Sequence, residues 1–349
     1  MVAQRRNDAS QGAFTLVEML VVLVIIGLLA GLTTTVVVSA RRNVNASVVS
    51  MMEAQLTIAL EEYKNRYGEY PPDFSDPDAV MRHVRKRWPR YNVPDYDSFM
   101  GDIWFGSRLS SSGVASPLPS DMDELFTPST RTIRPKPYVS ALVFWLGGLP
   151  DENGVPSGFY AASRCPLGVV HDRTDSKKVS FIQRPERAKR EPPLYSFEKK
   201  YLKAYTTSAP SSVDTPMEGD GSTLNEVSEA YCPYAPAYCQ GGRPILYFRP
   251  SPNSPYGKKN IYYNTGDEVS CAVPYARGFS KSGSGVDWYG ENRFQLIHPG
   301  ADGLFGNSDY GNTPDAARML QPRSATVGMA DDDNVVNFVE QGTLENEYK

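Results

Sequence analysis

The sequence contains few of the residue types that build most enzyme and metal sites. Its 349 residues include only three His and four Cys. No C-x-x-C or H-x-x-x-H spacing occurs among them, which argues against a zinc site with the usual ligand spacing. The G-x-S-x-G, H-E-x-x-H and P-loop motifs are also absent, and His83, His171 and His298 lie in no catalytic motif. We therefore expect a protein without enzymatic activity rather than, for example, a membrane-tethered hydrolase.

Neither the charge nor the mean hydropathy of the chain is extreme. The 36 Lys and Arg face 40 Asp and Glu, for a net charge of −4, so the basic excess of a general nucleic-acid-binding protein is missing. The mean hydropathy of −0.41 excludes a protein with many membrane spans and leaves room for a single one. The length suffices for one large domain or two.

One long apolar run lies near the N-terminus. Residues 19–32 carry no polar side chain, and the run continues to Ala40. About 20 apolar residues are enough for a helix to cross the roughly 30 Å of membrane hydrocarbon. Residues 1–13 are polar and contain a pair of Arg, and a second pair follows at 41–42, so charge does not predict the orientation.

Glu18 stands inside the start of this apolar run. A carboxylate in a membrane costs several kcal/mol unless it has a partner, which makes such a residue a candidate functional group. The alternative is that Glu18 lies at the membrane surface and reaches the water, since only four residues separate it from the polar leader.

The residues around Glu18 form a recognisable motif. The segment 12–20 reads GAFTLVEML and resembles the class III signal of type IV pilins and type II secretion pseudopilins. The resemblance implies that a prepilin peptidase cleaves between Ala13 and Phe14, that Phe14 is N-methylated, and that Glu18 stays in the membrane. The family usually has Gly before the cleaved bond, so cleavage after Gly12 is the alternative here.

The resemblance also implies self-assembly and an orientation with the leader inside the cytoplasm. Cleavage exposes an α-amino group that pairs with Glu18 of a neighbouring subunit, and such a buried pair sets the register of subunits more than it adds stability. A secretory signal cleaved after Ala40 is the competing interpretation. Its apolar region would be unusually long and interrupted by Glu18, so we favour the prepilin interpretation.

An amphipathic pattern continues beyond the apolar run. A three- and four-residue spacing predicts one helix from Phe14 to Tyr67, about 80 Å long at 1.5 Å per residue. Gly68 and the prolines at 71–72 end it. Charged residues, Glu53 among them, are expected off the apolar stripe, which consists of Val44, Val48, Met52, Leu56, Leu60, Tyr63 and Tyr67.

Residues 60–72 (LEEYKNRYGEYPP) resemble the end of this helix in G-type major pseudopilins. The implied fold is α+β and type IV pilin-like: a long N-terminal helix, with a membrane half and an amphipathic half, packed on an enlarged globular head with a small antiparallel sheet. The corresponding domains are a leader (1–13), a transmembrane and filament-core helix (14–40), an amphipathic helix (41–70) and an extracytoplasmic head with loop insertions (71–349).

The head is larger than that of an ordinary major pseudopilin. Residues 138–146 are predicted to form a short buried helix or a strand, and strands are predicted at 244–248, 261–263 and 294–298. The Ser-, Pro- and Gly-rich segments 107–130 and 207–230 are predicted to be exposed or disordered loops.

Near the C-terminus, residues 294–303 and 331–338 resemble a strand, a G-x-D-G turn and the closing segment of G-type pseudopilins. In that family these loops hold calcium, a cation that prefers oxygen ligands. The resemblance implies Asp302, Asp332 and Asp333 as ligands, with Asp309 as a further candidate. Asn334 replaces the family's second Asp, and an acidic solvated turn without metal is the alternative. No other cofactor is expected.

The four cysteines would lie outside the cytoplasm, where disulfides persist. Cys232 and Cys239 could close a small loop, leaving Cys165 and Cys271 for a second bridge. Four cysteines allow three pairings, and free buried thiols also remain open.

Together these patterns predict a structural subunit of a type II secretion pseudopilus. The implied partners are other copies of the chain, the prepilin peptidase and N-methyltransferase, the inner-membrane assembly platform and minor pseudopilins. The implied location is the inner membrane, crossed once, with the processed filament in the periplasm. The alternative is a type IV pilin for adhesion or DNA uptake. Basic clusters at 82–90, beside Trp88 and Tyr91, and at 184–190 could contact nucleic acid, but we favour a solvated face or contacts with acidic neighbouring subunits.

Overall fold

The computed structural model describes residues 16–112, 138–172, 179–182, 188–203, 237–240, 243–250, 256, 262–264, 270–279, 286–306, 318–319, 332–339 and 343–344. It divides into two compact units, residues 1–45 and 46–349. The predicted leader, the loop at 207–230 and the cleavage-site residues Gly12, Ala13 and Phe14 lie outside the described residues, as do most of the loop at 107–130 and of the basic cluster at 184–190.

The first element is a helix of 52 residues, α1 (Leu16–Tyr67), which confirms the predicted continuous helix. It ends because Gly68 adopts φ +81° and its N–H donates to the carbonyl of Lys64 at 2.7 Å. A residue with a Cβ rarely takes this conformation, so Gly68 is the expected terminator. The positive charges of Lys64 and Arg66 in the last turn stabilise the helix, because they lie near the negative end of its dipole.

The buried face of α1 in the second unit differs in part from the predicted stripe. Met52, Leu56, Leu60 and Tyr63 are buried as predicted, and Val48 and Tyr67 are partly buried. Val44 is exposed, which corrects its assignment to the stripe. Val44 also falls before the second unit begins.

Glu53 is a second correction to the stripe, because the structure buries it completely. At about 100° per residue, position 53 lies about 20° from Leu60 and about 40° from Val49, at the edge of the face of the helix that points inward. Its position in the helical register, and not its charge, decides that it is buried.

Two further helices follow α1. In α2 (Pro77–Arg87) the side chain of Asp76 accepts hydrogen bonds from the N–H groups of Asp78 and Ala79, at 3.0 and 3.3 Å, and caps the start of the helix. The helix α3 (Tyr96–Ser112) extends six residues into the segment predicted as a loop at 107–130, so this part of the loop prediction is wrong. Apolar residues keep α2 and α3 on the core, as Val80, Val84 and Phe99 are fully buried.

The apolar run at 138–146 is helical, the first of the two predicted alternatives. It ends in the π-helix η1 (Val143–Gly147), whose five residues are all buried. Gly148 follows with φ +78°, and a Cβ there would lie 2.4 Å from the carbonyl carbon of Gly158. Only glycine fits where these two backbone segments meet.

The strands are short and form five small sheets in the described part of the chain. The predicted strands at 244–248, 261–263 and 294–298 correspond to β5 (Arg243–Pro244) with β6 (Leu246–Phe248), to β7 (Tyr262–Asn264) and to β11 (Gln295–His298). The prediction of one small antiparallel sheet is too simple, because Gly, Pro and loops interrupt the strands and one pair, β9 (Tyr275–Phe279) with β12 (Arg318–Met319), is parallel. The sheets are β1 (Val169–His171) with β2 (Val179–Phe181); β3 (Leu202–Lys203), β4 (Ala237–Gln240) and β5 (Arg243–Pro244); β6 (Leu246–Phe248), β11 (Gln295–His298) and β13 (Val335–Val336); β7 (Tyr262–Asn264) with β8 (Ser270–Ala272); and β9 (Tyr275–Phe279), β10 (Val286–Trp288) and β12 (Arg318–Met319).

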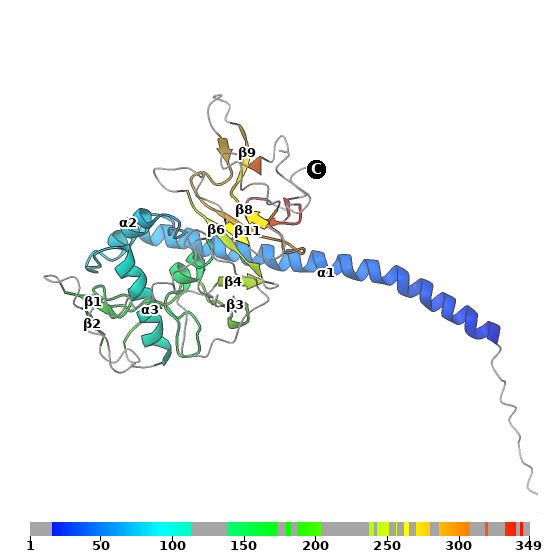
Figure 1. Cartoon of the computed structure of the whole chain (residues 1–349), viewed down its shortest axis with the longest axis horizontal. Helices are drawn as coiled ribbons and strands as arrows, with labels where there is room; N and C mark the ends of the chain where they lie inside the picture. Colours follow the sequence, from blue (N-terminus) through cyan, green and yellow to red (C-terminus); the bar gives the residue numbers. More distant parts are fainter. Residues whose placement is uncertain are drawn as a thin grey trace, which may run out of the picture. The chain divides into compact units, whose positions relative to one another are not determined.

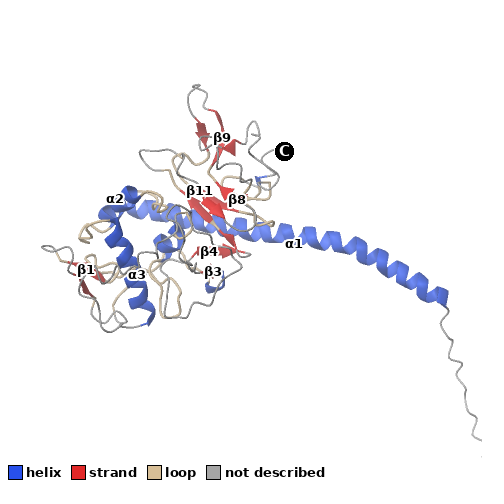
Figure 2. Cartoon of the chain, viewed as in Figure 1, coloured by secondary structure: helices blue, strands red, loops and turns tan. Residues whose placement is uncertain are grey.

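Two hydrophobic clusters organise the second unit. The larger one joins α1, α2, α3 and η1 around Trp145, whose indole N–H donates to the carbonyl of Pro72 at 2.9 Å. The smaller one lies among β6, β8, β9 and β11. In the view of Figure 1, α2 and α3 group near the end of α1 at Tyr67, and Figure 2 shows the strands β8, β9 and β11 as a separate group. The result is a mixed α+β chain with a long N-terminal helix and small, mostly antiparallel sheets, which is compatible with a pilin-like fold.

Candidate functional site: the N-terminal signal helix and the polar clusters of the head

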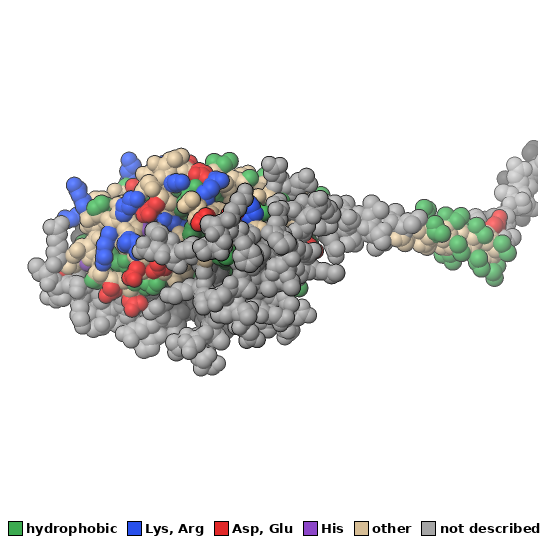
Figure 3. Space-filling view, turned by 90° about the horizontal axis from the view of Figure 1, so that it is seen from above, with side chains coloured by type: hydrophobic (Ala, Val, Ile, Leu, Met, Phe, Trp, Pro, Cys, Tyr) green, Lys and Arg blue, Asp and Glu red, His purple; other side chains and the backbone are tan. Residues whose placement is uncertain are grey.

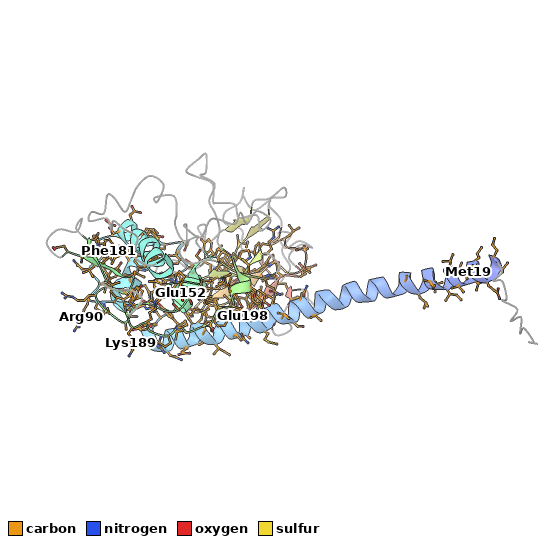
Figure 4. The ribbon with its side chains drawn as sticks, turned by 90° about the horizontal axis from the view of Figure 1, so that it is seen from below. Met19, Arg90, Glu152, Phe181, Lys189 and Glu198 are labelled. Carbon is orange, nitrogen blue, oxygen red and sulfur yellow. The ribbon has the colours of Figure 1, made fainter. Side chains whose placement is uncertain are left out.

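The first turns of α1 combine exposed apolar side chains with one acidic residue. All side chains from Leu16 to Gly31 are exposed, and Glu18 lies in the first turn. Figure 3 shows mostly hydrophobic side chains on this stretch, and Met19 is labelled on it in Figure 4. A carboxylate in the first turn is favoured by the helix dipole. An exposed apolar surface of this length indicates a segment that is covered by a membrane or by other protein chains.

In the part of the chain that the structure describes, no helix is both long enough and apolar enough to span a membrane. The predicted span over residues 14–40 is not confirmed.

A chain of hydrogen bonds joins the end of α1 to α2. His83 Nδ1 lies 2.8 Å from Oε1 of Glu69, and its Nε2 lies 2.6 Å from the hydroxyl of Tyr63. Arg87 then donates to the same hydroxyl at 2.8 Å. The hydrogen bond from His83 lowers the pKa of Glu69 to about 2, whereas burial lowers the pKa of His83. His83 is therefore neutral at pH 7, donating from Nδ1 to Glu69 and accepting from Tyr63.

Arg87 is the only residue of the basic cluster 82–90 whose guanidinium is packed on aromatic rings in the described structure. Its guanidinium carbon lies 4.3–5.7 Å from the ring centres of Tyr63, Tyr67, Trp88, Trp145 and Phe159. These cation–π contacts fix the C-terminal end of α2 to the end of α1. Arg87 is therefore structural.

The aromatic residues of this basic cluster point inward. Trp88 and Tyr91 are 6% and 3% exposed, so neither presents a ring on which a nucleic-acid base could stack. Arg82, Arg85, Lys86 and Arg90 are exposed, and Figure 4 places Arg90 at the periphery of the second unit. The contact pattern favours the predicted solvated face over a nucleic-acid interface.

Asp102 and His171 form a buried pair that the sequence did not reveal. His171 Nε2 lies 2.6 Å from Oδ2 of Asp102, which also accepts a short hydrogen bond from the hydroxyl of Tyr91. Burial raises the pKa of Asp102, against the opposing effect of His171. The side chains of Asp102 and His171 have no exposed surface, so the pair ties α3 to β1 and does not open to a substrate. No motif links two residues 69 positions apart, so spacing could not have found it.

Glu53 is a further buried acid, and it has no hydrogen-bond partner among the described residues. Both carboxylate oxygens of Glu53 and the hydroxyl of Thr57, one turn later, are buried and make no hydrogen bond within the described part of the chain. Burial raises the pKa of Glu53 well above its ordinary value. A carboxyl group in such a place is protonated and neutral, because burying an isolated charge costs far more free energy than binding a proton. Its spacing from Val49, four residues earlier, was the signal that could have predicted this burial.

The predicted calcium ligands lie at a turn that the protein closes with its own groups. Asp333 Oδ2 accepts hydrogen bonds from the N–H groups of Ala301 and Asp302, at 2.7 and 3.0 Å. Asp302 Oδ1 accepts from the N–H of Leu304 at 2.7 Å. The structure thus brings Asp302 and Asp333 together, with Asp332 next in the chain and partly buried. Asp309 lies outside the described residues.

The donor set at this turn is incomplete for a metal. Among the described residues there is no group of three or more His, Cys, Asp or Glu side chains that could hold one. Asp333 Oδ1 and Asn334 Oδ1 are nevertheless buried, with no hydrogen-bond partner in the segments that the structure describes, and such oxygens suit calcium. The calcium site stays a prediction.

Two of the four cysteines are described with their side chains. Cys165 and Cys239 have buried, reduced thiols. Every arrangement with two disulfides needs both of these residues, so the structure corresponds to the predicted alternative of buried thiols at these positions.

Comparison with known proteins identifies the N-terminal segment. Residues 8–34 match the family described as the prokaryotic N-terminal methylation motif. No curated protein and no solved structure matches the chain. The matched segment contains Gly12, Ala13, Phe14 and Glu18. The chain therefore carries the signal of a type IV pilin-like protein that a prepilin peptidase processes, and this signal indicates membrane-associated assembly through the N-terminus.

Proposed function

We propose that this protein is a structural subunit of a type II secretion pseudopilus. In this proposal the chain is cleaved before Phe14, N-methylated there, and held in the inner membrane by its N-terminal helix with the head outside the cytoplasm. Subunits then polymerise in the periplasm through that helix, with the assembly platform and minor pseudopilins as partners. No catalysis is proposed.

The observation that carries the proposal is the continuity between the signal and α1. The methylation motif at 8–34 leads without interruption into a helix that runs to Tyr67. Its first 16 described residues are exposed, and all of them except Glu18 are apolar and uncharged. A helix that exposes so much apolar surface needs other chains or lipid around it, as a filament subunit does before and after assembly.

The choice of secretion over adhesion or DNA uptake rests on residues 60–72, which resemble the G-type major pseudopilins. The alternative, a type IV pilin, is supported by the exposed basic residues of α2, although Trp88 and Tyr91 are buried. Deleting the gene separates the two functions: loss of secreted proteins with normal attachment supports the pseudopilus, and the reverse outcome supports a pilus.

We also propose that Asp302, Asp332 and Asp333 bind calcium, which would order the turn. Two observations bear on this. The buried side-chain oxygens of Asp333 and Asn334, which find no hydrogen-bond partner among the described residues, support it. Arg243 weighs against it, because its guanidinium Nε lies within 3.3 Å of the Cβ position of Gly303 in the same turn.

The experiment that tests the main proposal is the mass and N-terminal sequence of the mature protein from membranes. A chain that begins with N-methylated Phe14 supports processing as a prepilin. A chain that begins at Arg41 indicates a secreted protein instead, and an intact Met1 indicates an unprocessed anchor. The last two outcomes each contradict the proposal.

A further inference from the structure

His83 joins α2 to the end of α1 and to the turn that follows it. Its Nδ1 faces the Glu69 carboxylate at 2.8 Å, and its Nε2 faces the Tyr63 hydroxyl at 2.6 Å. The residue is 2% exposed, and its ring packs edge-on against Trp145 with the ring centres 5.0 Å apart. Water has little access to either nitrogen, so the groups of the protein itself decide what a second proton on the ring does.

The contact at Nε2 requires that this nitrogen carry no proton. Arg87 donates from Nη1 to the Tyr63 oxygen at 2.8 Å, so this oxygen already acts as an acceptor. The phenolic proton of Tyr63 is then donated to Nε2 of His83, which must offer its lone pair. Tyr63 is fully buried, and within the described part of the chain its hydroxyl makes hydrogen bonds to these two partners only.

A proton on Nε2 turns this acceptor into a second donor toward the same oxygen. The Tyr63 hydroxyl then has to accept from both His83 and Arg87, and its own proton loses its acceptor. A buried donor without an acceptor costs free energy, because it has given up its hydrogen bond to water. The imidazolium also stands next to the Arg87 guanidinium across one oxygen atom, and the two positive charges repel each other.

The charged groups around His83 do not remove this conflict. Glu69, whose pKa is about 2, stays ionised and favours an imidazolium. Burial opposes the imidazolium, and so do the positive charges of Arg87 and Arg249, with the result that the pKa of His83 lies below its ordinary value of 6.5. The helix α3 also packs on α2, but its buried carboxylate, Asp102, is engaged by other residues.

We infer that His83 is an acid-sensitive latch between α1 and α2. With a neutral ring, the hydrogen bonds from Glu69 through His83 and Tyr63 to Arg87 fasten α2 to the end of α1. With a protonated ring, the bond from Nδ1 to Glu69 persists while the contact at Tyr63 is lost, so the C-terminal end of α2 opens locally. The inference concerns the head alone and holds whether or not the proposed function is correct.

The latch has a defined pH range. The open state binds a proton on His83 at the ordinary pKa of 6.5, whereas the closed state binds it at a lower pH. The open state therefore gains population as the pH falls below 6.5, and it stops gaining once the closed state is protonated too. This range lies above the pKa of Glu69, so the two groups act at different pH.

Hydrogen–deuterium exchange of the full-length protein in detergent micelles tests the latch. Amide exchange is followed in peptides that cover α2 at pH 7 and at pH 5, and is corrected for the intrinsic effect of pH. We expect exchange at the C-terminal end of α2 to be at least about fivefold faster at pH 5, because the proton favours the open state. The fully buried strand β6 should exchange at the same corrected rate at both pH values.

Two histidine variants separate the latch from a general effect of acid. His83→Gln removes the titrating group and keeps an acceptor oxygen for Tyr63, so its α2 peptides should exchange equally at pH 7 and pH 5. His298→Gln is the matched control, because His298 is also buried, with a pKa lowered to about 4, and lies near the carbonyl of Gln240 instead. This variant should keep the acid response of the wild type. An acid response that persists in His83→Gln, or a wild type without one, overturns the inference.

The wild type alone decides the question where His83→Gln does not fold. Exchange at the carbon between the two ring nitrogens reports the protonation of each of the three histidines in the same sample. The acid response of α2 should level off at the pH at which His83 becomes protonated. A response that levels off with His171 or His298 instead overturns the inference.

Discussion

The imidazole Nδ1 of His83 lies 2.8 Å from the carboxylate of Glu69, so α2 is tied directly to the residue that follows the turn at the end of α1. Lys86 and Arg249 also approach the Glu69 carboxylate, at 3.6 and 3.5 Å. Their charges and the hydrogen bond from His83 explain why the pKa of Glu69 falls to about 2.

This arrangement predicts a contribution to stability that acid removes. The pKa of Glu69 is about 2 in the folded chain against 4.5 ordinarily, so the unfolded chain binds a proton first as the pH falls. Glu69→Gln should lower the free energy of unfolding by about 2 kcal/mol at pH 7. The difference from wild type should shrink between about pH 4.5 and 2 in urea unfolding. Glu62→Gln, at the exposed Arg66 pair, should cost less than about 0.5 kcal/mol; an equal loss in both variants would contradict the prediction.

Glu53 should give the opposite pH dependence. Burial raises its pKa, so the folded chain holds a proton that the unfolded chain has released, and stability falls as the pH rises above about 4.5. Glu53→Leu should therefore raise the free energy of unfolding at pH 7 by about 1–3 kcal/mol and flatten its pH dependence. Glu152→Leu, at an exposed position, serves as control and should keep the wild-type pH profile. A destabilised Glu53→Leu would show that Glu53 has a partner.

Gly148 and Gly154 form a matched pair for testing the backbone contact behind η1. Both have positive φ, but a Cβ at Gly148 would meet the backbone of Gly158, whereas nothing lies within 4 Å of one at Gly154. Gly148→Ala should cost more than about 3 kcal/mol, since the conformational strain and the clash add. Gly154→Ala should cost about 1 kcal/mol, the strain alone. Thermal unfolding measures both, and similar losses would exclude the clash.

Glu18→Ala tests the assembly role of the acid in the first turn. We expect normal cleavage and methylation, read by the N-terminal mass, together with loss of filaments, because the partner of the new α-amino group is gone. Met19→Ala, at the neighbouring exposed position, should assemble normally. Filaments of normal number and length in Glu18→Ala would contradict the pairing.

Calcium addition tests the C-terminal turn. If Asp302, Asp332 and Asp333 bind the ion, the Tm of the wild type should rise by several degrees in calcium relative to chelator, because a ligand that binds only the folded state stabilises it. Asp332→Asn should reduce that shift, while Asp287→Asn, on the half-buried strand β10 away from this turn in the sequence, should keep it. An equal Tm in calcium and chelator would indicate a turn that closes without metal.

The sequence predicted the features that depend on local pattern. The end of α1 followed from Gly68 and the prolines, and the strand β11 from a short apolar run between Gly and Pro. The signal at 8–34 was recognisable because its residues are contiguous. Each of these features is decided within one contiguous stretch of the chain.

The features that the sequence did not predict depend on contacts between distant segments. Asp102 and His171 meet because α3 packs on β1. The rings around Arg87 come from α1, η1 and two separate residues, Trp88 and Phe159. Glu53 was placed outside the buried stripe because its charge outweighed its position in the helical register. The five separate sheets follow from pairings across long loops, which alternation of side chains does not specify.

The anchoring of Arg87 has a consequence for the response of the protein to ionic strength. Its guanidinium is held by five aromatic rings and by hydrogen bonds to the hydroxyls of Tyr63 and Tyr67. Mobile ions weaken exposed ion pairs such as Glu62–Arg66, but they cannot enter a packed cluster of rings. The junction between α1 and α2 should therefore hold equally well in dilute and in concentrated salt, while contacts made by the exposed arginines around it weaken.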